Sequence, residues 1–145
     1  MPLHQLSVLV ENKPGTMAKA LAAVENQSEI FALSIAEAGE FGLARFIVSE
    51  PEKASKHLED SGFNLAKSKR NIEVTGVLIT DKITASKAAQ ILGDNGVNIE
   101  YTYSSSLPIN GRFALILRTD DVKKTEELLT GNGAELLSQT DLVRS

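Results

Sequence analysis

Apolar residues near the N-terminus follow first a strand pattern and then a helix pattern. The run LSVLV, residues 6–10, is β-rich. After it, Met17, Leu21 and Val24 recur at i, i+4 and i+7, which is the spacing of one helix face. The segment NKPG, residues 12–15, joins the two patterns. The sequence therefore predicts a strand that passes abruptly into an amphipathic helix.

The segments that follow complete a β-α-β-β-α-β order. Residues 30–38 and 43–50 are strand-like and flank GEFG, residues 39–42, which supplies the glycines that a tight hairpin turn needs. A proline at its start and a glycine at its end mark a helix over 51–62. The segment FNLAKS after it is interpreted as a closing strand.

The same order recurs in the second half of the chain. Three landmarks repeat at similar offsets: 68 residues from Phe31 to Ile99, 69 residues from Gly42 to Gly111 and 71 residues from Gly62 to Gly133. A nearly constant offset with small insertions indicates duplication. The predicted elements are a strand over 72–80, a helix over 84–96, a hairpin pair within 97–106 and 111–119, a helix over 120–133 and a strand over 134–139.

We therefore expect an α+β chain of two tandem ferredoxin-like units, residues 1–70 and 71–145. Each unit is expected to be an antiparallel sheet with its helices on one face. The polar, basic segment 67–71 is interpreted as a solvated linker. Exposed edge strands predict that the two sheets pair side by side into a continuous sheet and that the chain forms a homodimer. Because many functions use this fold, the fold alone decides none of them.

Hydrophobic residues on the helices and central strands are predicted to form the cores. Phe46 and Phe113 fall on central strands. Core packing is the favoured interpretation of both, because an RNA-binding sheet needs basic flanks and these are acidic or neutral. The inward helix positions are Met17, Leu21 and Val24, then Ala54 and Leu58, and then Ala88, Ile91 and Leu92.

Charge and composition narrow the classes of partner. The net charge of -4 and the pI of about 5.2 give no electrostatic footprint for nucleic acid or for an anionic membrane surface. No apolar run approaches the roughly 20 residues of a membrane span, and MPLHQLSV lacks the layout of a signal peptide. The cytoplasm is therefore the expected location. The absence of cysteine excludes disulfides, thiolate metal sites and cysteine nucleophiles.

Candidate catalytic and metal-binding residues are scarce. His4 and His57 are the only histidines, and neither has a partner at catalytic or ligand spacing. We therefore predict no catalytic residue, no metal site and no cofactor. The NKPG segment has a single glycine, too few for a loop that cradles phosphate. A helix that starts there still offers unpaired N–H donors to one carboxylate.

In this context the NKPG segment resembles the corresponding loop of the ACT domain, an amino-acid-sensing regulatory module. The first repeat carries it as VENKPGTMAKAL, and LITDKITASKAAQIL followed by GVNIEYTY holds the same place in the second. The segments FGLARFIVSEPEKA and NIEYTYSS are especially similar to small stand-alone tandem ACT proteins. The resemblance covers nearly the whole chain, with no catalytic domain attached.

The resemblance implies a non-catalytic regulatory protein that binds a free amino acid, or a similar small effector, where two ACT units meet. The loop after the first strand of one unit would then face the second strand of its neighbour. Carried over residue by residue, the loop supplies Asn12, Lys13, Pro14, Gly15, Thr16 and Met17, and the strand supplies Asn98, Ile99, Glu100 and Tyr101.

Elementary chemistry is compatible with such a site. The backbone N–H groups of Gly15, Thr16 and Met17 could bind an α-carboxylate. The Asn12 amide could donate or accept, and Glu100 could accept from an α-ammonium. Gly15 would also permit close approach of the ligand to the backbone.

The second repeat departs from this pattern. Ile83-Thr84 stands where the first repeat has Pro14-Gly15, so the close backbone approach is lost while Thr84 remains a good N-cap. The pseudo-symmetric site, residues 81–86 against 31–33, is therefore in doubt. We expect one good site per chain.

Two other functions remain open from the sequence. The chain could be a regulatory subunit of a metabolic enzyme that acts through protein contacts and binds no ligand itself, or a ferredoxin-like pair that binds RNA. Tyr101 and Tyr103, at i and i+2 of one strand, fit a rim over a ligand and packing at a sheet edge equally well. The identity of the amino acid and of the partner is not encoded in a readable motif.

Overall fold

The computed structural model describes residues 2–65 and 72–142, and the chain divides into two compact units. The first unit is formed by His4–Ile72 and the second by Glu73–Leu142. The predicted linker, residues 67–71, lies outside the described residues.

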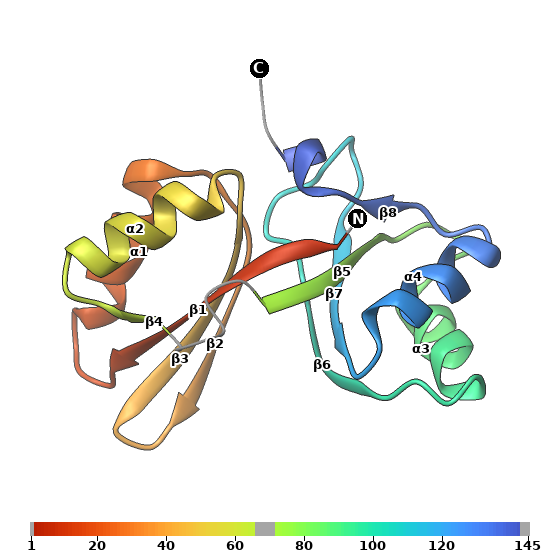
Figure 1. Ribbon diagram of the computed structural model, residues 1–145, viewed down its shortest axis with the longest axis horizontal. Helices are drawn as coiled ribbons and strands as arrows, with labels where there is room; N and C mark the ends of the chain where they lie inside the picture. Colours follow the sequence, from red (N-terminus) through yellow and green to blue (C-terminus); the bar gives the residue numbers. More distant parts are fainter. Residues whose placement is uncertain (1, 66–71, 143–145) are drawn as a thin grey trace. The chain divides into compact units, whose positions relative to one another are not determined.

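The first unit has the predicted β-α-β-β-α-β order. Its elements are β1 (Leu3–Glu11), α1 (Thr16–Gln27), β2 (Ile30–Ala38), β3 (Phe41–Val48), α2 (Pro51–Asp60) and β4 (Asn64–Leu65). β1 pairs with β3 and with β4, and β2 pairs with β3, so the antiparallel strand order is β2-β3-β1-β4. Figure 1 shows α1 and α2 together on one face of this sheet. The split β-α-β arrangement is confirmed.

The second unit repeats this arrangement. Its elements are β5 (Ile72–Leu78), α3 (Ala85–Asp94), β6 (Ile99–Ser104), β7 (Ala114–Thr119), α4 (Val122–Gly131), β8 (Leu136–Leu137) and a 3-10 helix (Gln139–Leu142) that the sequence did not predict. The antiparallel order is β6-β7-β5-β8. The α+β class with two ferredoxin-like units is therefore confirmed, and the side-by-side pairing of their sheets stays a prediction.

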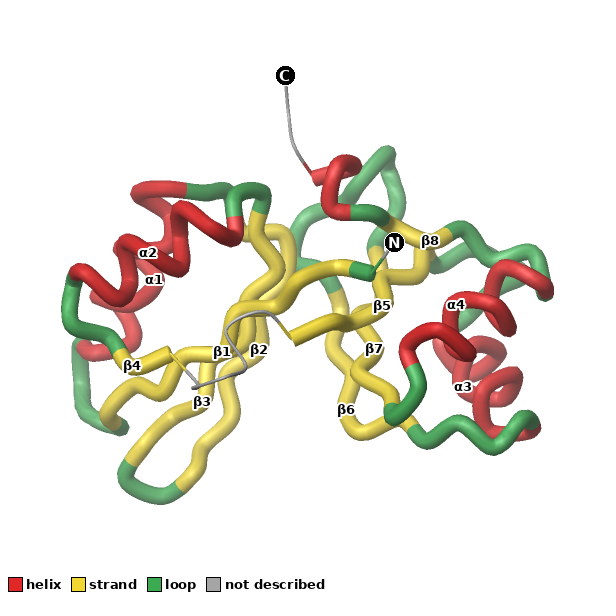
Figure 2. Tube along the Cα trace, viewed as in Figure 1, coloured by secondary structure: helices red, strands yellow, loops and turns green. Residues whose placement is uncertain are grey.

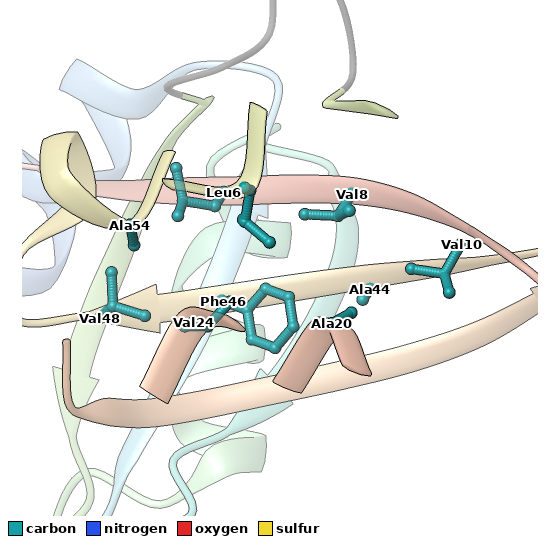
Figure 3. Packing of buried hydrophobic residues seen from close by; sticks show 10 residues of the cluster. Leu6, Val8, Val10, Ala20, Val24, Ala44, Phe46, Val48 and Ala54 are labelled. Carbon is teal, nitrogen blue, oxygen red and sulfur yellow. The ribbon is translucent and has the colours of Figure 1, made fainter. Parts of the chain in front are cut away.

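Alternate strand residues and one side of each helix form the core of the first unit. Leu6, Val8 and Val10 of β1 pack in one cluster with Phe46 of β3. Figure 3 shows the Phe46 ring among aliphatic side chains of both the strands and the helices. Of the predicted helix positions, Val24, Ala54 and Leu58 are fully buried, and Met17 and Leu21 are partly buried against the cluster.

The core of the second unit contains the predicted positions Ala88, Ile91 and Leu92. The prediction that Phe113 packs in a core is wrong, because its side chain is 52% exposed. β7 begins only at the next residue, and the first strand residue on the core side is Leu115. Phe113 is two residues before Leu115 and so lies on the same face of the sheet, but beyond the end of the core.

A β-bulge at matching places confirms the duplication. The register of β2 on β3 shifts at Phe31, and the register of β6 on β7 shifts at Glu100. A bulge inserts one unpaired residue and reverses the alternation of faces beyond it. Because both repeats carry the bulge early in the second strand, Phe31 corresponds to Glu100, and the predicted match of Phe31 with Ile99 is wrong by one residue.

The bulge also gives the correspondence along the next strand. The first residue after the bulge pairs with Ile47 of β3 in the first unit and with Arg118 of β7 in the second unit, so Ile47 corresponds to Arg118. Gly42 lies five residues before Ile47, and Phe113 lies five residues before Arg118. Phe113 therefore takes the place of Gly42 in the second unit. The predicted match of Gly42 with Gly111 is wrong. Gly111 lies in the connection 105–113 between β6 and β7, which Figure 2 draws as a loop and which is longer than the β2–β3 turn.

Candidate functional site

The NKPG segment forms a loop that is tied to the β2–β3 turn. β1 ends at Glu11 and α1 begins at Thr16. The Asn12 N–H donates to the Glu40 carbonyl at 2.8 Å, and Asn12 Nδ2 donates to the Gly39 carbonyl at 3.1 Å. These bonds hold the loop in place before any ligand arrives, which is usual for small-molecule sites.

Gly15 is the N-cap of α1 and has a left-handed backbone, with φ at 87°. A side chain is strained in this conformation, so the turn itself requires glycine here. The helix has no side-chain cap. In the described part of the chain the N–H groups of Gly15 and Met17 make no hydrogen bond, whereas the Thr16 N–H donates to the Lys13 carbonyl at 3.3 Å. The start of α1 therefore keeps donors for an anion.

A pocket of about 340 Å³ lies between the start of α1 and the strands β2 and β3. This volume is near the lower end of the range of ligand sites, roughly 300–1,000 Å³. Ile35 and Glu37 on β2 pair with Ala44 and Gly42 on β3, and they share the face of the core residue Ala44. The lining residues are Glu11, Asn12, Lys13, Thr16, Met17, Ile35, Ala36, Glu37 and Gly42.

The missing side chain of Gly42 contributes open space to this pocket. A Cβ built on Gly42 would lie 3.7 Å from Met17 Cε and 3.8 Å from the carbonyl oxygens of Val10 and Ala36. These are ordinary contact distances, so a methyl group fits there and a longer side chain would extend toward the pocket. The glycine is buried, and its φ is not positive.

The pocket contains part of the predicted loop and adds residues that the sequence interpretation missed. Pro14 and Gly15 are exposed and do not line it. The missed lining residues on β2 and β3 include Ile35, Glu37 and Gly42. The i, i+2 spacing of Ile35 and Glu37 on a strand next to the hairpin is a signal that could have placed both on one face.

In the corresponding loop of the second unit, side chains of the loop itself accept hydrogen bonds from the backbone N–H groups. Thr84 caps α3, accepting from the Lys87 N–H at 3.2 Å. Thr80 Oγ1 accepts from the Ile83 N–H at 2.9 Å, and Ile83 is buried in the second core. With Phe113 in the place of the pocket glycine, this loop has the contacts of a structural turn.

The predicted residues of the second repeat lie in β6 and just before it. Asn98 precedes the strand, and Ile99 packs against the second core. Glu100 Oε1 lies 3.4 Å from Arg118 Nε. Because the bulge at Glu100 reverses the alternation, Tyr101 lies on the opposite face of the sheet from Ile99. That these residues meet the NKPG loop stays a prediction.

Two glycines test the conformational interpretation of the loop. Gly15→Ala should lower the free energy of unfolding by about 1–2 kcal/mol, because alanine is strained at positive φ. The control Gly93→Ala lies within α3, where a Cβ meets nothing within 4 Å. That change should raise stability by about 0.5–1 kcal/mol. Urea unfolding followed by circular dichroism measures both, and effects of equal sign would contradict the conformational assignment.

Two other kinds of site receive no support from the structure. Among residues 2–65 and 72–142, no group of three or more His, Cys, Asp or Glu side chains could hold a metal ion. Within these same ranges, no helix is both long enough and apolar enough to cross a membrane.

Comparisons with known proteins agree with this architecture. A family profile described as an ACT domain pair matches residues 1–145. The crystal structure of protein BT0572 from Bacteroides thetaiotaomicron matches with 32% identity and a TM-score of 0.83, over 100% of this chain and 98% of that chain. A search of curated proteins found no match.

Two further crystal structures share the fold at lower identity. They are regulatory subunits of aspartate kinase, from Thermus thermophilus in the ligand-free form and from Thermus flavus. The identities are 17% and 16% and the TM-scores 0.59 and 0.57, in both cases over 90% of this chain and 93% of theirs.

Proposed function

Because the chain belongs to the ACT domain pair family, we propose that it is a non-catalytic regulatory protein that binds a free amino acid. The observation that carries the proposal is the pocket of about 340 Å³ beside the start of α1. A loop already fixed by hydrogen bonds, a helix start with free N–H groups and a cavity large enough for a small molecule meet at one place in the first unit.

The pocket offers a distinct environment to each part of an amino acid. The N–H group of Met17 and the positive end of the α1 dipole suit the α-carboxylate. Ile35, which is 47% exposed, and the half-buried Met17 supply apolar surface for a side chain. Carboxylates at the rim suit the α-ammonium. Asn98, Ile99, Glu100 and Tyr101 are proposed to complete the site, as the family resemblance implies.

One such site per chain is proposed. Pro14-Gly15 is replaced by Ile83-Thr84 in the second unit, and the open position of Gly42 is replaced by a phenyl ring at Phe113. The phenyl ring reduces the room for a ligand beside α3, and the Thr84 side chain takes a backbone N–H of that helix start for its own cap.

We also propose that binding is passed on to a partner protein, a metabolic enzyme, and that the chain acts as a homodimer. The shared fold of the aspartate kinase regulatory subunits supports a partner of this class. An edge strand in each unit, β2 and β6, supports association between copies. The cytoplasm is the proposed location.

A thermal-shift screen against the twenty amino acids tests the proposal. A ligand that binds only the folded state at 100 times its Kd adds about 2.7 kcal/mol of stability. For a chain of this length we expect at least one amino acid to raise Tm by about 5 °C or more. If no amino acid shifts the melt at millimolar concentration, the chain is not an amino-acid sensor, and its regulatory role would depend on protein contacts alone.

A further inference from the structure

Two side chains of the pocket already donate hydrogen bonds within the loop. Asn12 Nδ2 donates to the Gly39 carbonyl at 3.1 Å. The Thr16 hydroxyl donates to the carbonyls of Glu11 and Lys13. The Thr16 hydroxyl oxygen and Asn12 Oδ1 still offer lone pairs that accept hydrogen bonds from a ligand, and Asn12 Nδ2 keeps its second N–H.

The charged side chains of the pocket add further acceptors. Lys13 Nζ lies 3.2 Å from Glu11 Oε2, so the one lysine among the lining residues is paired with a carboxylate of the same lining. In the described part of the chain, no basic side chain forms an ion pair with Glu37. The Glu11–Lys13 pair roughly cancels, and the pocket retains the negative charge of Glu37.

From this balance we infer that the ligand is a neutral amino acid with an apolar side chain, and that its α-ammonium group binds Glu37. This inference rests on the proposed function. A pocket rich in acceptors needs a ligand that donates, and an ammonium group has three N–H donors and the opposite charge. Aspartate and glutamate are rejected because their second carboxylate would face the Glu37 carboxylate and the lone pairs of other acceptor oxygens.

The apolar residues of the pocket favour a ligand with an apolar side chain. Ile35 stands two residues from Glu37 on the same face of β2, and Met17 borders Gly42, the residue paired with Glu37. A ligand with its ammonium at Glu37 therefore has apolar surface beside its side chain. Its carboxylate is left for the start of α1, where a backbone N–H group is free.

Isothermal titration of the full chain with chosen probes tests the inference. The probes are valine, leucine and methionine, then aspartate and glutamate, and then the 2-hydroxy acid analogues of the first three. At least one of the three neutral amino acids should bind ten times more tightly than either acidic one. Its 2-hydroxy analogue, which lacks the ammonium, should lose at least tenfold in affinity.

Matched variants assign the effect to Glu37. E37Q keeps the size of the side chain and should weaken binding of the neutral amino acid about tenfold. E40Q removes the same charge from the hairpin turn outside the pocket and should leave the Kd unchanged. Acidic amino acids that bind as tightly as neutral ones, or an E37Q chain with unchanged Kd, would overturn the ligand class and leave amino-acid binding itself intact. If none of the probes and none of the twenty amino acids binds, the proposed function is what fails.

Discussion

Replacing Phe46 by alanine should lower the free energy of unfolding of the first unit by about 3–5 kcal/mol. The ring is fully buried in the cluster that joins β1, β3 and the two helices. Its removal leaves a cavity that Ala44 and the other aliphatic neighbours cannot fill, so both the burial and the packing contacts are lost. This is a large fraction of the 5–15 kcal/mol that stabilises an ordinary domain.

Phe41→Ala is the matched control, because Phe41 lies on the same strand and its side chain is 42% exposed. That substitution should cost less than about 1 kcal/mol. Urea unfolding followed by circular dichroism reports both units. Tyrosine fluorescence reports the second unit alone, because Tyr101 and Tyr103 are the only tyrosines and the chain has no tryptophan. Equal losses for the two phenylalanine variants would mean that the core has been assigned to the wrong residues.

Gly42→Phe should abolish the amino-acid-induced rise in Tm. The substitution gives the first unit the residue that the second unit has at the same register position, Phe113. A Cβ at this position lies 3.7 Å from Met17 Cε, so the phenyl ring attached to it occupies the space on which the pocket depends. We expect Kd to rise at least tenfold while the far-ultraviolet circular dichroism stays that of the wild type, because the second unit folds with this residue.

Two variants make this experiment decisive. Phe113→Ala changes the corresponding position of the other repeat and should leave the thermal shift at its wild-type size. Gly42→Ala adds only a methyl group at ordinary contact distances and should weaken binding by less than the phenylalanine variant does. The Gly42→Ala chain also keeps the test usable if Gly42→Phe does not fold. Wild-type affinity in a folded Gly42→Phe chain would place the ligand elsewhere.

Local patterns were sufficient to predict the helices and strands of both units, although not the 3-10 helix Gln139–Leu142. A strand pattern of period 2 and a helix pattern of period 3.6 depend on neighbouring residues, so each can be read within about ten positions. The predicted strand over 30–38 agrees with β2, and the helix predicted from Pro51 begins there. Position-specific residues gave the helix ends, since Thr84 is the N-cap of α3 and Gly62 and Gly133 follow α2 and α4 with positive φ.

The candidate site could be predicted only in part. Asn12, Lys13, Thr16 and Met17, which one continuous motif carries, line the pocket of the first unit, and their role in binding stays a prediction. The importance of Gly15 was recognised, but its reason is the left-handed backbone that begins α1. The role of Phe113 was missed, because the offset between repeats changes inside the second hairpin and the sequence contains no marker of where it changes.

By itself the sequence determined the order of the elements, their duplication and the break at NKPG, because these depend on residues that are neighbours in the chain. Only the tertiary structure decided that Ile35, Glu37 and Gly42 line a pocket with Met17, and that Phe113 takes the place of Gly42. The register of strands that are distant in sequence brings these residues together. That register follows from a one-residue bulge and from the length of a connection, neither of which leaves a periodic trace in the sequence.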